Sequence, residues 1–377
     1  FGGKASNYGL LRRVLPTNSA VAIAFSFDLW NDFMEQPLAG GATLREEIRR
    51  RLHDFTYPPN MAALQTTLEG IRALIRQTAR FTAAQEQVVT NALAGFDPRR
   101  KLRFRSSTNL EDADSYSGAG LYDSYSGCLL DDLDTDHRGP CACDPAEPEE
   151  RGVFRAIRRV YASFYNDNAV LERLRHSVDE SRVGMALLVH YSSPDDIERA
   201  NGVATFTYTR NPTWCNYDGT LVTQLGAVSV ANPDGTALPE EVGITVYNLD
   251  ELHFIVPRYS SLLPLGVNVL DYPADYDALT RMIVQVTDPY AQLFPDKKRF
   301  VLDLEYKKLD PGWLDFKQVR EVPQPPNTNI PPYLLNEPVT FVPFQGLYGD
   351  LWAAHRLKSR WTLNTRTMSL TDSNLAA

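Results

Sequence analysis

Residues 299–321, RFVLDLEYKKLDPGWLDFKQVRE, contain the pattern that most restricts how this chain can fold. Apolar and polar residues alternate on both sides of the tetrapeptide DPGW, which suits a type II turn with proline second and glycine third. Alternation puts successive side chains on opposite faces of a strand, so Asp303 and Glu305 point the same way. The segment therefore predicts a β-hairpin with two carboxylates on one face.

The predicted hairpin also gathers an amide and a guanidinium beside these carboxylates. If it closes symmetrically about its turn, Glu305 lies opposite Gln318 and Asp303 lies opposite Arg320. Carboxylate and amide oxygens suit Mg²⁺, and arginine suits phosphate oxygens, so the cluster predicts a site for both. The alternative is a cross-strand Asp–Arg ion pair on a solvated face, and a one-residue shift of register would disperse the cluster. Alternation in the second strand also predicts that Leu314 and Phe316 share the face of Gln318 and Arg320.

The remaining pattern mixes helices and strands. Helical spacing of apolar residues marks two segments, 68–93 and 151–165, as helices that face a core, with Val88 among the core residues of the first. Strand-like runs follow in the second half, at 183–191, 201–209 and 220–230. A chain of 377 residues exceeds the size of a single core, so we expect an α+β protein of two or more lobes.

A polar, glycine-containing stretch follows the basic strand KLRFR at 101–105. Arg105 is expected to end that strand, and Ser106 to Asn109 then offer hydroxyls and an amide. Small residues let backbone N–H groups approach an anion, which predicts a phosphate-binding loop; the alternative is an ordinary surface turn. The loop residues in question are Ser117, Gly118, Ala119 and Gly120. Lys4 follows two glycines but lacks the Walker A spacing, and on its own it is interpreted as an exposed lysine.

Charge and cysteine content exclude several classes of function. A net charge of -9 argues against a protein that mainly binds nucleic acid or an anionic membrane. We find no apolar run of membrane-spanning length and no signal peptide, and the four cysteines are too few for a disulfide framework. We therefore expect a soluble cytoplasmic protein. The segment 129–150 is acidic and broken by three prolines, so it is interpreted as a solvated surface loop. A metal site at Cys141, Cys143 and His137 is the less favoured alternative, because neither the C-x-C nor the lone histidine matches zinc spacings.

Several segments resemble, in order, one known domain. They are GGKASNYGLL, RSSTNLED, SYSGAGLYDS, FRAIRRVYASFYNDNA, GMALLVHY, GVATFTYTRNP, LDLEYK and FKQVR. Together they resemble the ATP-binding (PEP/pyruvate-binding) domain of the dikinase family, which includes pyruvate phosphate dikinase, phosphoenolpyruvate synthase, glucan water dikinase and rifampicin phosphotransferase. The resemblance implies an ATP-grasp fold, in which ATP lies in the cleft between two lobes. The lobes would be residues 1–188 and 189–323, followed by a Pro-rich linker and an incomplete C-terminal extension at 324–377.

The resemblance also implies roles for individual residues. Lys4 and Arg105 would contact the ATP phosphates, which the loop Ser117 to Gly120 would cover. Asp303, Glu305 and Gln318 would bind Mg²⁺, and Arg320 would reach a phosphate. His190 stands beside the adenine position where many family members have glutamine, and Ala227 stands where an acidic residue often follows a glycine.

The implied function is a Mg²⁺-dependent phosphotransferase of the dikinase type, which converts ATP to AMP and phosphate. Lys4, Arg105 and Arg320 would neutralise charge on the transferred group, and the family passes a phosphoryl group to a histidine on a swivelling domain. None of the six histidines here has the Thr-x-His setting of that carrier, so the acceptor is expected outside this chain. Two alternatives stay open: a nucleotide sensor or scaffold without turnover, and a small-molecule kinase that acts on a sugar or an antibiotic.

Overall fold

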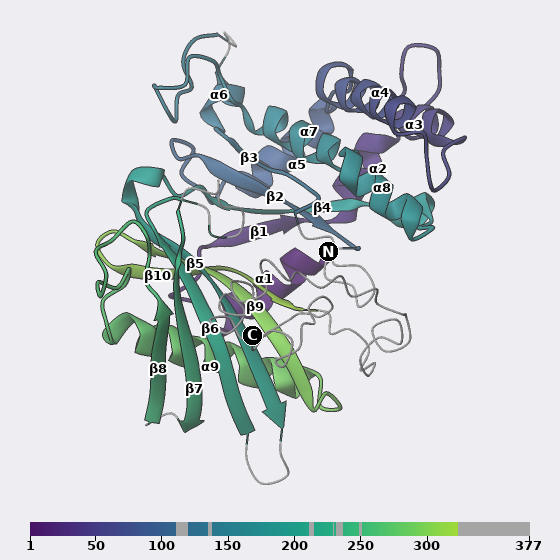
Figure 1. Ribbon diagram of the computed structural model, residues 1–377. Helices are drawn as coiled ribbons and strands as arrows, with labels where there is room; N and C mark the ends of the chain where they lie inside the picture. The colour runs from purple at the N-terminus through teal and green to yellow at the C-terminus, as the bar shows by residue number, and fades with distance from the viewer. Residues whose placement is uncertain are drawn as a thin grey trace, which may run out of the picture. The chain divides into compact units, whose positions relative to one another are not determined.

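Two antiparallel β-sheets organise the part of the chain that the computed structural model describes (Figure 1). The described residues are 1–110, 120–134, 138–210, 215–228, 230, 237–248 and 251–322. They belong to one compact unit, Phe1–Pro323. Helices pack against both sheets, which agrees with the predicted α+β class.

The smaller sheet has four strands in the order β1-β4-β2-β3, so β3 is an edge strand. Every pairing in it is antiparallel. The strands are β1 (Ala22–Phe25), β2 (Leu102–Thr108), β3 (Ser124–Gly127) and β4 (Met185–Tyr191). β4 is buried from Met185 to His190, because it is central and covered on both faces.

Helices from the first half of the chain bury one face of this sheet in a shared apolar core (Figure 1). They are α2 (Phe27–Met34), α3 (Leu44–Leu52), α4 (Met61–Ala73), α5 (Ala83–Leu93), α6 (Leu130–Leu133), α7 (Val153–Ser163) and α8 (Asp167–Arg175), with 3₁₀ turns at Glu180–Arg182 and Asp195–Ile197. The predicted stripe on α7 is confirmed, since its apolar residues are buried: Val153, Ile157, Val160, Tyr161 and Phe164.

The segment 68–93, predicted as helical, is broken in its middle. α4 runs into a π-helical turn, Leu74–Thr78, and α5 begins only at Ala83. Thr82 and Gln85 form a capping box, which satisfies two N–H groups at the start of α5 and so favours a new helix there. Val88 was predicted in the core but is 60% exposed, because the buried face of α5 contains Val89 and Leu93 instead.

The larger sheet has six strands in the order β10-β9-β5-β6-β7-β8. Its strands are β5 (Glu198–Arg210), β6 (Cys215–Leu225), β7 (Glu240–Asn248), β8 (Glu251–Arg258), β9 (Arg299–Leu309) and β10 (Trp313–Glu321). The long helix α9 (Ala274–Leu293) and the first helix α1 (Gly3–Val14) share a second apolar core with it (Figure 1). α1 also contacts β2 and β4, so it links the two sheets.

Strand β2 is longer than predicted. It continues past Arg105 to Thr108, and Ser106, Ser107 and Thr108 are fully buried in it. Their polarity was interpreted as a loop, but the Ser107 hydroxyl accepts a hydrogen bond from Ala5 N at 2.9 Å and is thereby satisfied inside the fold. Four of the residues that follow the loop, Ser124–Gly127, pair with β2 as strand β3.

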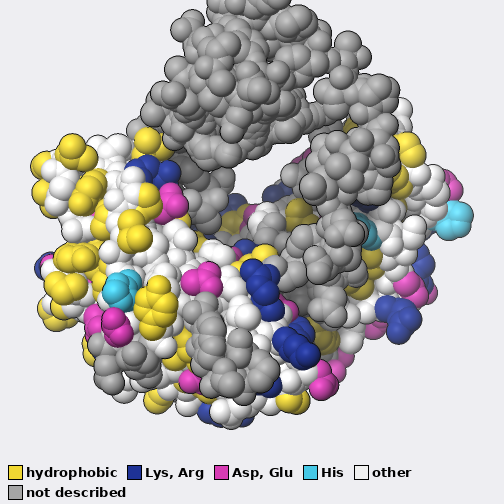
Figure 2. Space-filling view, turned by 60° about the horizontal axis from the view of Figure 1, so that its bottom comes forward, with side chains coloured by type: hydrophobic (Ala, Val, Ile, Leu, Met, Phe, Trp, Pro, Cys, Tyr) yellow, Lys and Arg dark blue, Asp and Glu magenta, His cyan; other side chains and the backbone are white. Residues whose placement is uncertain are grey.

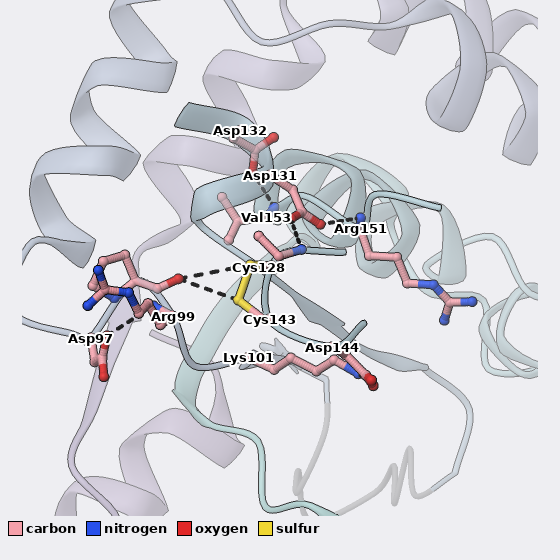
Figure 3. Close-up of a disulfide and its surroundings, with 12 residues drawn as sticks. Asp97, Arg99, Lys101, Cys128, Asp131, Asp132, Cys143, Asp144, Arg151 and Val153 are labelled. Atoms are coloured by element: carbon pink, nitrogen blue, oxygen red, sulfur yellow. Dashed lines mark hydrogen bonds and ion pairs between the residues drawn. A yellow bond between two sulfur atoms is a disulfide. The ribbon is translucent and has the colours of Figure 1, made fainter. Parts of the chain in front are cut away.

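A disulfide joins Cys128 to Cys143 in the acidic segment, although four cysteines gave no reason to predict one (Figure 3). Asp131 is buried beside it, and its carboxylate accepts hydrogen bonds from Ala142 N at 2.8 Å and Arg151 N at 2.6 Å. Asp132 accepts from Val153 N and so caps α7, whose own N-cap residue is a glycine. The segment is therefore anchored to the fold at several points. Cys143, one of the residues considered for a metal site, forms the disulfide instead.

Basic and acidic side chains are interspersed on the face shown in Figure 2, where Lys and Arg lie beside Asp and Glu. Among the described residues visible in this view, side chains of one charge form no extended patch. Within the described ranges, no helix combines the length and the apolar character needed to cross a membrane.

Candidate functional site

The hairpin β9–β10 forms with the pairs predicted from its sequence. Gln318 lies opposite Glu305, and Arg320 lies opposite Asp303. The register near the turn is different, since Phe316 pairs with Tyr306, one residue away from the symmetric arrangement. A β-bulge between Phe316 and Gln318 restores the predicted register beyond it.

Because of the bulge, the faces predicted for β10 were wrong on the side of the turn. Leu314, Phe316 and Val319 lie in the apolar core, so Leu314 and Phe316 do not share a face with Gln318 and Arg320. A bulge adds one residue to one strand, which inverts the alternation on its far side. Without it, the aromatic Phe316 would stand among the polar groups that the hairpin gathers.

Asp303 and Glu305 lie on the polar face of β9 as predicted. Their neighbours Leu302, Leu304 and Tyr306 are buried in the core, and the two acidic side chains remain accessible at 14% and 42%. Arg320 donates to Asp303 from Nε at 3.1 Å and from Nη2 at 2.6 Å. The ion pair expected as an alternative is therefore present, and it holds a guanidinium beside the carboxylates.

Arg105 connects the two sheets at this point. From β2 it donates to three acceptors of the hairpin: Gln318 Oε1 at 2.7 Å, Glu305 Oε2 at 3.3 Å and the Lys317 carbonyl at 2.9 Å. Its side chain is only 14% exposed, so these contacts compensate a charge that is largely withdrawn from water. A residue from the first half of the chain thus completes a cluster built in the second half.

The donor set fits a hard divalent cation. Two carboxylates and one amide oxygen lie on neighbouring positions of β9 and β10, and oxygen is the ligand type that Mg²⁺ prefers. The Gln318 oxygen accepts from Arg105 but has a second lone pair, and the Glu305 side chain is partly open to solvent. The three predicted ligands, Asp303, Glu305 and Gln318, are therefore brought together.

Lys4 lies at the first turn of α1, next to the end of β2. Its Nζ is 3.4 Å from Ser106 Oγ, one residue from Arg105. The approach of α1 depends on Gly2, where a Cβ atom would lie 2.1 Å from the Ser107 carbonyl oxygen. Gly2 thus has a packing role, and Lys4 lies against the residue that follows Arg105.

His190, at the end of β4, is 5% exposed and uncharged at neutral pH. Burial, reinforced by the charges of Arg105 and Lys317, lowers its pKa from 6.5 to about 3. Its Nδ1 donates to the Tyr191 carbonyl at 2.8 Å, and its Nε2 is a buried acceptor that has no partner among the described residues. The ring stacks on Tyr8 of α1, with centroids 6.2 Å apart.

A cavity of about 330 Å³ opens between these groups. Sequence reasoning missed most of its lining, although alternation along KLRFR and RFVLDLEYK places Arg103 on the face of Arg105 and Lys307 on the face of Glu305. Lys317 reaches the cavity from the bulge, which no sequence pattern indicates. The cavity is lined by Arg103, Arg105, Ser124, His190, Ser192, Ser193, Asp195, Glu305, Lys307 and Lys317.

Of the predicted phosphate loop, Ser117 to Gly120, only Gly120 lies among the described residues. Ser117, Gly118 and Ala119 lie outside the described residues. Gly120 has a positive φ of 74°, which suits glycine, and it lines a separate depression together with Arg72 and Asn166. Asp303, Gln318 and Arg320 also lie outside the lining of the 330 Å³ cavity, although they adjoin its Glu305.

Comparison with known proteins adds independent information. Residues 1–240 match the family described as the AMP/ATP-binding domain of pyruvate phosphate dikinase. Over 191 residues the chain is 28% identical to the rifampicin phosphotransferase of Streptomyces sviceus. That alignment covers 50% of this chain and 19% of the relative, so the chain spans only a small part of the relative's length. The family match includes Lys4, Arg105 and His190 and ends before the hairpin.

Proposed function

Because the chain belongs to the family of pyruvate phosphate dikinase AMP/ATP-binding domains, we propose that it is a Mg²⁺-dependent phosphotransferase module of the dikinase type. The proposed fold is ATP-grasp, with lobes at 1–188 and 189–323 and ATP between them. One observation carries the proposal. Arg105 of the small sheet meets Glu305 and Gln318 of the large sheet, and both Arg105 and Glu305 line the cavity where the nucleotide would lie.

The nucleotide base would lie at the end of the cavity formed by His190 and the residues that follow β4. Since the neutral His190 ring donates through Nδ1, its Nε2 is left to accept a hydrogen bond, and an exocyclic amino group is a suitable donor. A charged ring at this position would repel such a donor. The lowered pKa of His190 is therefore compatible with binding of a base.

The triphosphate would extend toward Arg105, Lys4 and Arg320. Arg105 bonds to Glu305 and Arg320 bonds to Asp303, so both cations lie on the surface that would hold the phosphates, while Lys4 lies 3.4 Å from Ser106, the residue after Arg105. Their role would be to orient the phosphates and to stabilise negative charge on the transferred group. Asp303, Glu305 and Gln318 would hold Mg²⁺, which supplies further neutralisation of the phosphate oxygens.

The phosphoryl acceptor would come from outside this chain, either a histidine on a swivelling domain or a small molecule. A small-molecule acceptor is favoured by one finding, the similarity to a protein named rifampicin phosphotransferase. A cytoplasmic location and the absence of nucleic-acid and membrane partners remain predictions from the sequence.

Product analysis tests the proposal. The chain is incubated with Mg-ATP, alone and with rifampicin, a sugar or a phosphohistidine domain of the family as acceptor, and nucleotides are separated by chromatography. AMP that depends on an acceptor supports the dikinase reaction, whereas ADP identifies a simple kinase. Saturable ATP binding with neither product indicates a sensor, and the absence of binding contradicts the proposal altogether. Arg105→Ala serves as the inactive control.

A further inference from the structure

A second cavity, of about 220 Å³, lies along the edge strand β3 and is strongly basic. Its polar lining includes five cationic side chains and a single carboxylate, that of Glu147. Arg103 is shared with the 330 Å³ cavity, so the two cavities adjoin at this residue. The five cations are Lys101, Arg103, Arg151, Arg155 and Arg159.

The local folding of β2 and α7 produces this arrangement. Arg103 precedes Arg105 on the same face of β2, and Lys101 lies just before the strand. Arg155 and Arg159 are four residues apart and lie on one side of α7, while its apolar stripe faces the core; Arg151 lies just before the N-cap residue Gly152. The Arg151 main chain is fixed by its N–H bond to Asp131, and its guanidinium extends away from that contact (Figure 3).

Carboxylates compensate only part of this charge. Lys101 pairs with Asp144, Arg151 pairs with Glu147 at 2.5 Å, and Arg155 reaches the exposed Glu149 at 3.6 Å. Within the described part of the chain, no carboxylate lies at ion-pair distance from Arg103 or Arg159. Among the described residues, two of the five cations therefore lack a carboxylate at that distance.

The two remaining arginines are held at the cavity wall by neutral groups. Arg103 is half-buried and donates weakly to Ser126 Oγ at 3.4 Å, and Arg159 lies 5.1 Å from the centre of the Tyr125 ring. Partial withdrawal of a guanidinium from water has a cost that a carboxylate or another anion can offset. Burial and the charge of Arg105 lower the pKa of Arg103, and burial together with the charges of Arg159 and Arg151 lowers that of Arg155. Burial is the larger cause in both, and a bound anion would offset the smaller contribution of the neighbouring arginine charges.

We propose that this basic cavity is a binding site for a small phosphate-class oxyanion, separate from the nucleotide site. Arginine guanidiniums and a serine hydroxyl are donors that suit phosphate oxygens. The cavity is large enough for inorganic phosphate or a small phosphorylated molecule, and it is smaller than the 330 Å³ cavity at the proposed nucleotide site. Because Arg103 borders both cavities, an anion bound here also alters the field at the nucleotide site.

Calorimetric titration with inorganic phosphate in metal-free buffer tests the proposal on the full chain. The double variant Arg155→Gln and Arg159→Gln should weaken phosphate binding by at least about tenfold, since each guanidinium contributes charge-assisted hydrogen bonds. The same variant should change the affinity for Mg-ATP by less than about twofold. Arg105→Ala should weaken Mg-ATP binding and leave phosphate binding nearly unchanged. The two variants therefore distinguish a wrong assignment of this cavity from a wrong assignment of the nucleotide site.

The matched control is the double variant Arg49→Gln and Arg50→Gln, which removes the same charge from α3. Equal weakening in this control would mean nonspecific attraction and would overturn the proposal. Phosphate binding that is lost only in Arg105→Ala would place the anion at the nucleotide site, and no saturable binding would mean that there is no site. If the arginine variant fails to fold, hydrogen exchange of the unaltered chain decides: phosphate should protect residues 151–159 and leave 44–52 unchanged.

Discussion

His190 should make the stability of the fold depend on pH in a way that can be measured. Its pKa is 6.5 in an unfolded chain and about 3 in the fold, because the ring is buried beside Arg105, Lys317 and Arg103. Since the folded value is the lower one, the stabilisation is fully present above pH 6.5 and is lost as the pH falls toward 3. Each pH unit within that window costs about 1.4 kcal/mol of unfolding free energy.

The perturbation is His190→Gln, which keeps a hydrogen-bond donor but does not titrate. Between about pH 7 and about pH 4.5, which is two units below the unfolded pKa, the unfolding free energy of the wild-type protein should fall by about 3 kcal/mol more than that of the variant. Urea denaturation at the two pH values, followed by circular dichroism, gives both unfolding free energies. His53→Gln is the matched control, because that side chain is exposed and its loss should leave the pH dependence unchanged.

An equal loss of stability in the wild type and in His190→Gln would refute this reasoning. It would mean that His190 accepts a proton inside the fold at no great cost. The cavity would then be more hydrated than its burial indicates, and the neutral ring would no longer support a site for a nucleotide base.

Three further predictions concern the disulfide, the cap of α7 and the start of α1. Cys143→Ser should lower the unfolding free energy by about 3 kcal/mol in non-reducing urea denaturation, since the disulfide spans 15 residues; an unchanged midpoint would show that the thiols are unpaired. Burial raises the pKa of Asp132 from 3.8 to about 7, so its contribution to stability is present at low pH and lost as the pH rises between these values. The unfolding free energy of Asp132→Asn should therefore increase relative to that of the wild type as the pH rises from about 4 to about 7, and a relative decrease would contradict this. Gly2→Ala should displace α1 and weaken ATP binding, whereas Gly9→Ala, with open space around it, should leave ATP affinity unchanged in the same titration.

Local patterns predicted the hairpin and its acidic face well. Alternation along β9 is a property of nearest neighbours, so Asp303 and Glu305 could be placed without knowledge of the rest of the fold. The predicted pairs Glu305–Gln318 and Asp303–Arg320 were also right, although the register differs from the symmetric one near the turn and returns to it only after the bulge. The turn shifts the register by one residue and the bulge at Lys317 shifts it back, so the faces of Leu314 and Phe316 were wrong.

Contacts between distant segments could not be predicted from patterns. Ser106 and Ser107 are polar and were expected in a loop, and only the docking of α1 provides the partners that allow them to be buried in β2. The reach of Arg105 to Gln318 spans 213 residues, and no spacing rule covers such a separation. The Cys128–Cys143 bond likewise depends on how the acidic segment folds back, so the cysteine count alone was misleading. Disulfides are rare in the cytosol, which makes the redox state of this pair relevant to the predicted location.

Calorimetric titration with Mg-ATP tests the central claim most directly, which is that the hairpin carboxylates bind the metal of a bound nucleotide. Glu305→Ala should weaken Mg-ATP binding by at least about tenfold, Gln318→Ala should weaken it less because a neutral ligand attracts Mg²⁺ less strongly, and Glu86→Ala on α5 should have no effect. Unchanged Mg-ATP affinity in Glu305→Ala, with its fold intact, would contradict the account.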